Sequence, residues 1–515
     1  MTGASLIEAL LLTLLVTSLA AFATRWLGSW TQRSVEIAHL VGLTLALLLT
    51  GTIIAKVVRR ETLYALGDWL FVDALGAIFL GLIAVVGFIS GIYSIGYMRH
   101  GLAKADLDVR GLATFYGFFS LFLLAMSVAV LSNNLVLMWV AIECTTLSSV
   151  FLVGIYRTRT SLEAAWKYLV ICTVGVALGL YGTVLVFASA NSVMAPPGSA
   201  MLWTEVMKHA TSLEPATISM AFVFVLIGFG TKAELFPMHG WLPDALSGAP
   251  SPASALLSGA LANCAILVIV RHAAIAALAV GPHFPQTLLL VFGALSVAVG
   301  TFFIAVQRDV KRLLAYSSLE NMGLITLGFG LGGPLGIAAA LLHAINHSLA
   351  KTMLFCGSGN IVIKYGTRDL RQVKGMLKTA PFSGVLLIAG FLALGGIPPF
   401  NVFLSEFLTV TAGVKAGYGW LMVVGLIFLT IILAAFVRVI SGSILGSAPE
   451  GMAGGDPSAW TLVPLAVLLA LMLAIGLHVP GPMVQLISDA TEIVLGTPPA
   501  HVPETAPTEE MSWLK

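Results

Sequence analysis

The chain has 515 residues, of which 58% are hydrophobic and only 10% are charged, and its mean hydropathy is +0.99. This composition excludes an ordinary soluble domain and indicates a polytopic helical membrane protein. The formal net charge of +2 is too small to indicate nucleic acid or an acidic surface as a partner. Individual charges therefore matter by their position.

Apolar runs of roughly 20 residues predict membrane-spanning helices. The first run lacks the basic n-region and the cleavage site of a signal peptide, so we expect it to be a true span. In chain order the sequence predicts fourteen spans, at residues 4–24, 36–57, 70–96, 113–132, 134–155, 162–190, 217–242, 250–276, 286–306, 311–332, 335–363, 382–412, 417–446 and 459–480.

The basic residues predict the orientation of the chain. Most of the 26 Lys and Arg residues fall in loops on one side of these spans, the side that holds Arg25, Arg157 and Arg308. Loops rich in Lys and Arg are usually cytoplasmic, so we expect both termini outside the cytoplasm. The basic segment 364–380 is predicted to form an interfacial helix on the cytoplasmic face.

Two spans are predicted to be broken helices. Lys232 and Glu234 precede Pro237 in the seventh span, and two adjacent prolines precede Glu406 in the twelfth. Proline removes a backbone hydrogen bond and kinks a helix, which is tolerated at membrane depth only where protein or a water-filled cavity satisfies the freed groups. Both breaks therefore indicate functional positions.

The two breaks recur at a similar offset, and this spacing predicts an internal repeat. Five spans in each repeat, an odd number, would give the second repeat the opposite orientation in the membrane to the first, as in many transporters. The predicted units are an N-terminal group of three helices (1–112), a first inverted repeat (113–276), a second inverted repeat (286–446), and helix 14 with a polar tail (447–515).

Ionisable side chains within the spans are the candidate functional residues, because a charge at membrane depth is costly without a partner or internal water. His343, His347 and Lys351 recur every four residues and should line one helical face. Glu143 could pair with Lys232, so that a proton on one changes the proton affinity of the other. The full candidate set is Glu143, Lys167, Lys232, His343, His347, Lys351 and Glu406.

Simpler structural roles compete with these interpretations. A single buried histidine is more often a hydrogen-bonded packing residue, and two histidines four residues apart could ligate a metal or haem, but no other span carries a matching pair. The isolated cysteines support neither an iron–sulfur cluster nor a disulfide framework, so we expect no cofactor and no metal. Asp73, Asp244 and Glu320 are expected near span ends, where capping or interfacial solvation explains them.

Five motifs resemble a known family. They are NNLVLMWVAIE ending at Glu143, GTKAELFPMHGWLPDALSGAPSPASALLSG around Lys232, DVKRLLAYSSLENMG, HAINHSLAKTMLFCGSG and GGIPPFNVFLSEF. Over about residues 70–445 the chain resembles the antiporter-like, proton-translocating subunits of respiratory complex I, Mrp-type antiporters and membrane-bound hydrogenases. The resemblance is strongest to hydrogenase-4 component F.

The resemblance implies a fourteen-helix fold in which helices 4–8 and 9–13 are inverted repeats and helices 7 and 12 are broken. It implies that Glu143 is the helix-5 glutamate, Lys232 the helix-7 lysine, and Glu406 the terminal residue of helix 12, with central histidines between them. Glutamate at the last place resembles the middle antiporter-like subunit of complex I, and residues 481–515 leave no room for the distal subunit's long lateral helix. The family's helix-8 lysine would fall at Asn263, where this chain departs from the pattern.

The function implied is that of a proton-translocating subunit of a hydrogenase-4-like or complex I-like oxidoreductase in the bacterial cytoplasmic membrane. Protons would pass from Lys232 along the histidine face to Glu406. No redox centre is evident in the sequence, so other membrane subunits would have to supply the driving force. Two alternatives stay open. One is a cation/proton antiporter subunit, moving Na⁺ as well, or the membrane partner of an inorganic-carbon uptake protein. The other is a structural anchor, which Asn263 favours.

Overall fold

The computed structural model describes residues 3–28, 31–195 and 197–496. Its two short strands, β1 (Leu63–Ala65) and β2 (Leu70–Val72), pair antiparallel with Tyr64 opposite Phe71. The helices are α1 (Gly3–Ala23), α2 (Thr31–Val58), α3 (Ala74–Ala103), α4 (Val109–Leu131), α5 (Leu135–Val153), α6 (Arg159–Val193), α7 (Trp203–Lys208), α8 (Pro215–Lys232), α9 (Leu242–Gly248), α10 (Ser251–Leu256), α11 (Ala262–Val280), α12 (His283–Val306), α13 (Val310–Leu331), α14 (Gly333–Tyr365), α15 (Met376–Thr379), α16 (Pro381–Leu394), α17 (Asn401–Lys415), α18 (Gly419–Val439), α19 (Ala459–Leu477) and α20 (Gly481–Leu495).

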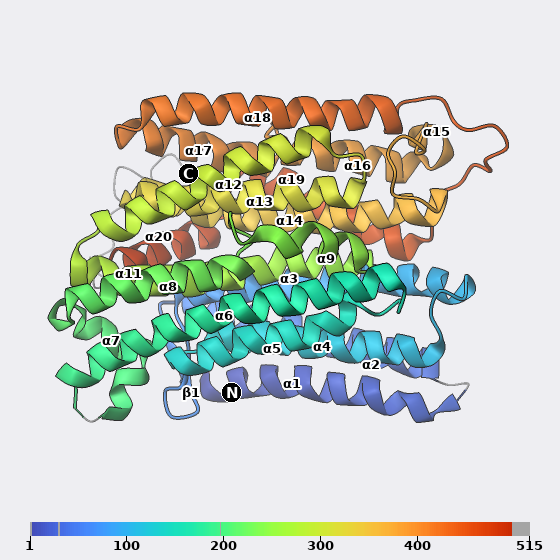
Figure 1. The fold of residues 1–515 in the computed structure, drawn as a ribbon. Coiled ribbons are helices and arrows are strands. Elements are labelled where there is room, and N and C mark those ends of the chain that lie inside the picture. Colours follow the sequence, from blue (N-terminus) through green and yellow to red (C-terminus); the bar gives the residue numbers. More distant parts are fainter. Residues whose placement is uncertain (1–2, 29–30, 196, 497–515) are drawn as a thin grey trace.

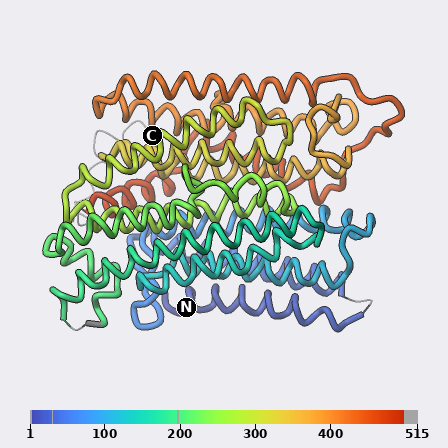
Figure 2. Tube along the Cα trace, viewed as in Figure 1, coloured from blue at the N-terminus to red at the C-terminus, as the bar shows by residue number. Residues whose placement is uncertain are grey.

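The long helices lie side by side in one bundle, with α1 at one edge and α18 at the other (Figure 1). The tube in Figure 2 shows that the first and second halves of the chain occupy opposite sides of this bundle. Within the described residues, eleven helices are long and apolar enough to cross a membrane. A helix satisfies its backbone groups internally, as a lipid environment demands. The chain is a multi-pass membrane protein.

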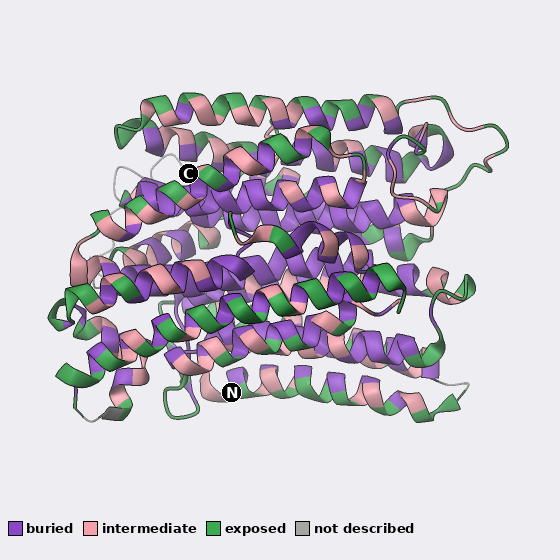
Figure 3. Ribbon diagram, viewed as in Figure 1, coloured by how far each residue is buried: buried purple, intermediate pink, exposed green. Residues whose placement is uncertain are grey.

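Burial is concentrated in the middle of the bundle (Figure 3). The apolar window within Ser251–Val280 is completely buried, whereas only 22% of the corresponding window in Gly419–Ile444, which includes α18, is buried. Helix α14 is buried without interruption from Leu335 to Ile361. Polar side chains in this stretch of α14 are therefore screened from the surface by other helices.

Both predicted helix interruptions are present. Helix α8 ends at Lys232, and the chain does not resume an α-helix until α9 begins at Leu242. Helix α16 ends at Leu394 and α17 begins at Asn401. A further irregularity, a π-helical turn at Leu257–Leu261, joins α10 to α11. The π-helical turn is buried throughout, whereas Pro237 in the first break and Pro398 and Pro399 in the second are exposed on the bundle.

The predicted interfacial helix over 364–380 is wrong. Helix α14 continues to Tyr365, and only the four residues of α15 are helical after it. Gly366 and Gly375 adopt left-handed conformations, which end regular helix. Between them Arg371 pairs with Asp369 at 2.6 Å, and its hydrogen bonds lower the pKa of Asp369 to about 2. The basic residues bind separate acceptors in a loop rather than sharing one helical face.

The predicted polar tail is also partly wrong, because it begins with helix α20. This helix packs against α3 and α14, and Gln485 donates a hydrogen bond to the Val58 carbonyl at 2.6 Å. Its apolar side chains, such as Ile487, are buried against the bundle. The remainder of the tail, residues 497–515, lies outside the described residues.

Candidate functional site

Lys232 is the last residue of α8, and its side chain is completely buried. Its Nζ donates a hydrogen bond to the Tyr168 hydroxyl at 2.8 Å and lies 4.6 Å from the centre of the same ring. The hydroxyl of Tyr168 in turn lies 2.7 Å from the Ser149 hydroxyl. A hydrogen-bonded series thus runs from α8 through α6 to α5. A buried ammonium group needs hydrogen-bond acceptors around it, and the Tyr168 hydroxyl is one.

Glu143 lies on α5 and is half-buried. Its carboxylate accepts hydrogen bonds from the Thr173 hydroxyl at 2.9 Å and the Thr146 hydroxyl at 3.3 Å. The predicted ion pair with Lys232 is wrong as a direct contact, because it is absent from the ion pairs within 4.0 Å among the described residues. Two threonines donate hydrogen bonds to Glu143, while Tyr168 accepts one from the Lys232 ammonium group. The charges of Glu143 and Lys232 still interact over the intervening distance.

Lys167 does not lie deep in the membrane, contrary to the prediction. Its side chain is 45% exposed, and its Nζ pairs with Glu163 at 2.7 Å and Asp244 at 3.2 Å. It stands near the beginning of α6, where a long side chain can reach the surface. Lys167 is therefore part of a surface ion-pair cluster.

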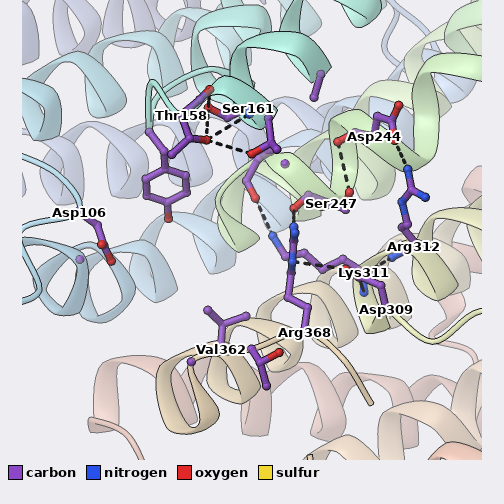
Figure 4. A pocket seen from close by; sticks show the side chains of 18 of the residues that line it. Asp106, Thr158, Ser161, Asp244, Ser247, Asp309, Lys311, Arg312, Val362 and Arg368 are labelled. Atoms are coloured by element: carbon purple, nitrogen blue, oxygen red, sulfur yellow. Dashed lines mark hydrogen bonds and ion pairs between the residues drawn. The ribbon is translucent and has the colours of Figure 1, made fainter. Parts of the chain in front are cut away.

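That cluster belongs to a cavity of about 1050 Å³ at the end of the bundle where α3 and α14 finish and α6 and α13 begin. Figure 4 shows Asp244, Arg312, Lys311 and Arg368 around it. Lys311 is buried, and its Nζ donates to the Ala249 carbonyl at 2.6 Å. Arg312 pairs with Asp244, and Arg368 donates to the Ser247 carbonyl. Charged side chains from both halves of the chain therefore line this cavity.

The predicted ladder on α14 is completely buried. His343 Nδ1 lies 2.9 Å from the Ser405 hydroxyl of α17, and neither ring nitrogen of His347 has a hydrogen-bond partner among the described residues. Lys351 Nζ donates to the Leu314 carbonyl of α13 at 3.0 Å and to the Ser317 hydroxyl. The described residues contain no group of three potential metal ligands.

Glu320 was predicted near a span end, and that prediction is wrong. It lies in the middle of α13, 1% exposed, and accepts a hydrogen bond from Asn321. Its charge interacts with that of Lys351. The sequence did contain a signal, since the predicted span 311–332 already placed this residue well inside. By contrast, capping is confirmed for Asp73, whose carboxylate accepts the Gly76 N–H at 2.7 Å.

Glu406 lies on α17, half-buried, beside the second helix break. A Cβ atom on Gly396, whose φ is +67°, would overlap the Glu406 carboxylate. The absence of a side chain at Gly396 therefore gives this carboxylate its place. The helix break and the position of the Glu406 carboxylate therefore depend on the same glycine.

Replacing Gly396 with alanine will destabilise the protein and displace Glu406. Gly417→Ala is the matched control, because Gly417 also has a positive φ of +85° but has nothing within 4 Å of its added Cβ. Both variants lose about 1 kcal/mol from backbone strain, and only Gly396→Ala adds a steric term. Thermal unfolding in detergent compares them, and equal losses in both variants would contradict the packing argument.

The model of the NADH:quinone oxidoreductase/Mrp antiporter transmembrane family matches residues 132–432, more than half of the chain. The chain belongs to this family. A second model, describing the N-terminus of NADH-ubiquinone oxidoreductase (complex I) chain 5, matches residues 69–105. The predicted resemblance is confirmed, and the protein is an antiporter-like membrane subunit.

Among its relatives, a hydrogenase-4 component F homolog from Methylacidiphilum infernorum is 38% identical, over 81% of this chain and 87% of the relative. Hydrogenase-4 component B of Escherichia coli is 32% identical over 65% of this chain, but the match spans only 50% of that longer protein.

Solved structures share the fold. A chain of the archaeal membrane-bound sulfane sulfur reductase superposes with a TM-score of 0.84 at 23% identity, covering 95% of this subunit and 97% of that chain. A chain of the Mrp complex from Dietzia sp. superposes with a TM-score of 0.82 at 21% identity, covering 96% and 97% respectively.

Proposed function

We propose that this subunit translocates protons within a hydrogenase-4-like or complex I-like membrane oxidoreductase. The observation that carries the proposal is the set of fully buried ionisable groups between the two helix breaks, with Lys232 at the first break and Lys351 at the centre. Buried charges in a membrane protein are costly and typically mark an ion pathway. The 38% identity to a hydrogenase-4 component F homolog supports the type of complex.

In the proposed route, a proton enters through the cavity lined by Lys311 and reaches Lys232, whose charge Glu143 modulates. It then passes to Lys351 and the histidines of α14 and leaves near Glu406. Tyr168 and Ser149 continue the hydrogen-bonded groups from Lys232 toward α5. Hydroxyl groups both donate and accept hydrogen bonds, so they can join charged groups into a relay.

The proposed topology has fourteen membrane crossings, with inverted repeats at 113–276 and 286–446 flanked by 1–112 and 447–515. Two helices broken at prolines, one in each repeat, support it. The cavity end of the bundle, rich in Lys and Arg, would face the cytoplasm, which would place both termini on the other side. The membrane would be the bacterial cytoplasmic membrane.

Other membrane subunits are the proposed partners and the source of energy. Moving a proton against a membrane potential costs on the order of 2.3 kcal/mol per 100 mV. The structural relatives are chains of multi-subunit membrane complexes. A partner module would couple an exergonic reaction to proton movement through this chain.

A cation/proton antiporter is the second candidate, favoured by 30% identity over 70% of this chain to the Na(+)/H(+) antiporter subunit A1 of Staphylococcus aureus. Purification of the native complex through a tag on this chain, followed by identification of its subunits, separates the two. We expect oxidoreductase subunits and proton uptake that does not require Na⁺. Recovery of antiporter subunits with Na⁺-dependent proton exchange would favour the second candidate.

Replacing Glu143 with glutamine will slow proton uptake by reconstituted vesicles about tenfold, because loss of an opposite charge worth about 1.4 kcal/mol changes the proton affinity of the relay by that factor. Glu61→Gln is the control, since Glu61 is a 45% exposed carboxylate that pairs with Lys56 away from the entry cavity. Equal uptake by both variants would contradict a role for Glu143.

A further inference from the structure

Glu234 stands in the first helix break in a conformation that is unusual for its residue type. Its φ is +64°, a left-handed backbone that side chains other than glycine rarely adopt. Its side chain is completely buried, and neither carboxylate oxygen has a hydrogen-bond partner among the described residues. The position therefore combines a strained backbone with a buried acid that has no hydrogen-bond partner. Both features cost folding free energy, so the stability of the fold does not explain them.

The second break shows which residue this backbone ordinarily prefers. Ala233 N–H donates to the Phe229 carbonyl at 2.8 Å and Leu235 N–H to the Gly230 carbonyl at 2.9 Å. In the second break, the N–H groups of Gly395 and Ile397 donate to the Phe391 and Leu392 carbonyls at 2.9 and 3.1 Å. The same pattern puts Gly396, with φ +67°, in the place that Glu234 takes.

Each break thus has one carboxylic acid at its left-handed residue. In the second break the acid is Glu406, whose carboxylate fills the space that a side chain on Gly396 would occupy. In the first break Glu234 carries the acid itself. The left-handed residue of the first break is therefore itself the one that carries the carboxylate.

The position of Glu234 relates it to both lysines of the proposed relay. It follows Lys232 by two residues, and its carboxylate interacts electrostatically with the ammonium group of Lys351. Asn263 cannot carry a proton between the two lysines, because an amide does not titrate. It instead donates a hydrogen bond to the Ser348 hydroxyl at 2.9 Å.

We propose that Glu234 is the proton carrier that joins Lys232 to Lys351, an inference that rests on the proposed function. The Glu234 carboxylate takes a proton from the Lys232 ammonium, leaving a neutral amine, and gives it to the neutral amine of Lys351. Glu234 then returns to the carboxylate form, and no other reactant is consumed. This transfer requires internal water between the three groups, of the kind that commonly binds buried unpaired polar groups.

The test compares the whole complex carrying Glu234→Gly, Glu234→Gln or Glu234→Asp. Glycine suits the left-handed backbone, so Glu234→Gly should unfold at the wild-type temperature or above it. Its proton uptake should nevertheless fall about 100-fold, as expected when a proton-transferring side chain is removed. Glu234→Gln should be equally slow, and Glu234→Asp, which keeps the acid, should recover part of the rate.

A spectroscopic measurement tests the carboxyl group itself. The infrared difference spectrum of the wild-type complex during turnover should contain a protonated-carboxyl signal that Glu234→Gly removes. Wild-type uptake in Glu234→Gly, with Lys232→Ala inactive, would overturn the role of Glu234 but leave the proposed function intact. Wild-type uptake in both variants would overturn the proposed function as well.

Discussion

Replacing Lys232 with alanine will abolish proton uptake by the reconstituted complex, while Lys208→Ala will leave uptake near the wild-type rate. Both lysines lie in the first half of the chain, but Lys232 is completely buried, whereas Lys208 is 65% exposed and does not line the proposed entry cavity. Without Lys232 the relay loses the titratable group that bonds Tyr168 at 2.8 Å. The exposed pair of Lys208 with Glu205 is worth only about 0–1 kcal/mol.

The measurement is the initial rate of acidification or alkalinisation inside vesicles that contain the purified complex. Equal recovery of all subunits in both variants shows that assembly is unaffected. Lys232→Arg is a further variant, because it keeps the charge but cannot release a proton in this range; it too should be inactive. Uptake at the wild-type rate by Lys232→Ala would contradict the proposed route.

Replacing Arg271 with methionine will produce a large loss of stability, about 3–5 kcal/mol, because it leaves a buried carboxylate without its partner. Two nitrogens of Arg271 donate to the Asp73 carboxylate at 3.0 and 2.9 Å. The guanidinium carbon lies 4.5 Å from the ring centres of Phe71 and Trp203. This buried group joins α11 to the beginning of α3 and to strand β2.

The double variant Arg271→Met/Asp73→Asn separates the lost pair from the uncompensated charge. It should recover part of the stability, since the amide carries no charge to bury. Lys208→Ala is the control, because Lys208 forms an exposed pair with Glu205. Denaturant unfolding in detergent gives the comparison. A loss in Arg271→Met no larger than that in Lys208→Ala would contradict the role assigned to the buried pair.

The sequence predicted the helical membrane fold and both helix breaks, because apolar length and proline act locally. The seventh predicted span ended at 242, and the structure ends α8 at Lys232 and begins α9 at Leu242. The loop at 364–380 was mispredicted because its basic residues meet the criteria for an interfacial helix. Two left-handed glycines and the Asp369–Arg371 pair override that composition.

The site was predicted less completely, because three-dimensional packing decides which side chains form hydrogen bonds with one another. Glu143 and Lys232 have opposite charges, but Tyr168 and Thr173 provide the hydrogen bonds that each group actually makes. No periodicity in one sequence indicates which helix will present a tyrosine to a lysine 64 residues away. The deep position of Glu320, in contrast, followed from its predicted span and should have been recognised.

The direct test of a route through both halves of the chain is proton uptake by the complex carrying Lys351→Ala. Lys351 lies at the centre of the bundle, donates to the Leu314 carbonyl at 3.0 Å, and interacts with the charges of both Glu234 and Glu320. A continuous route predicts that uptake falls to the level of vesicles without protein, although the complex assembles. Proton uptake at the wild-type rate would contradict it.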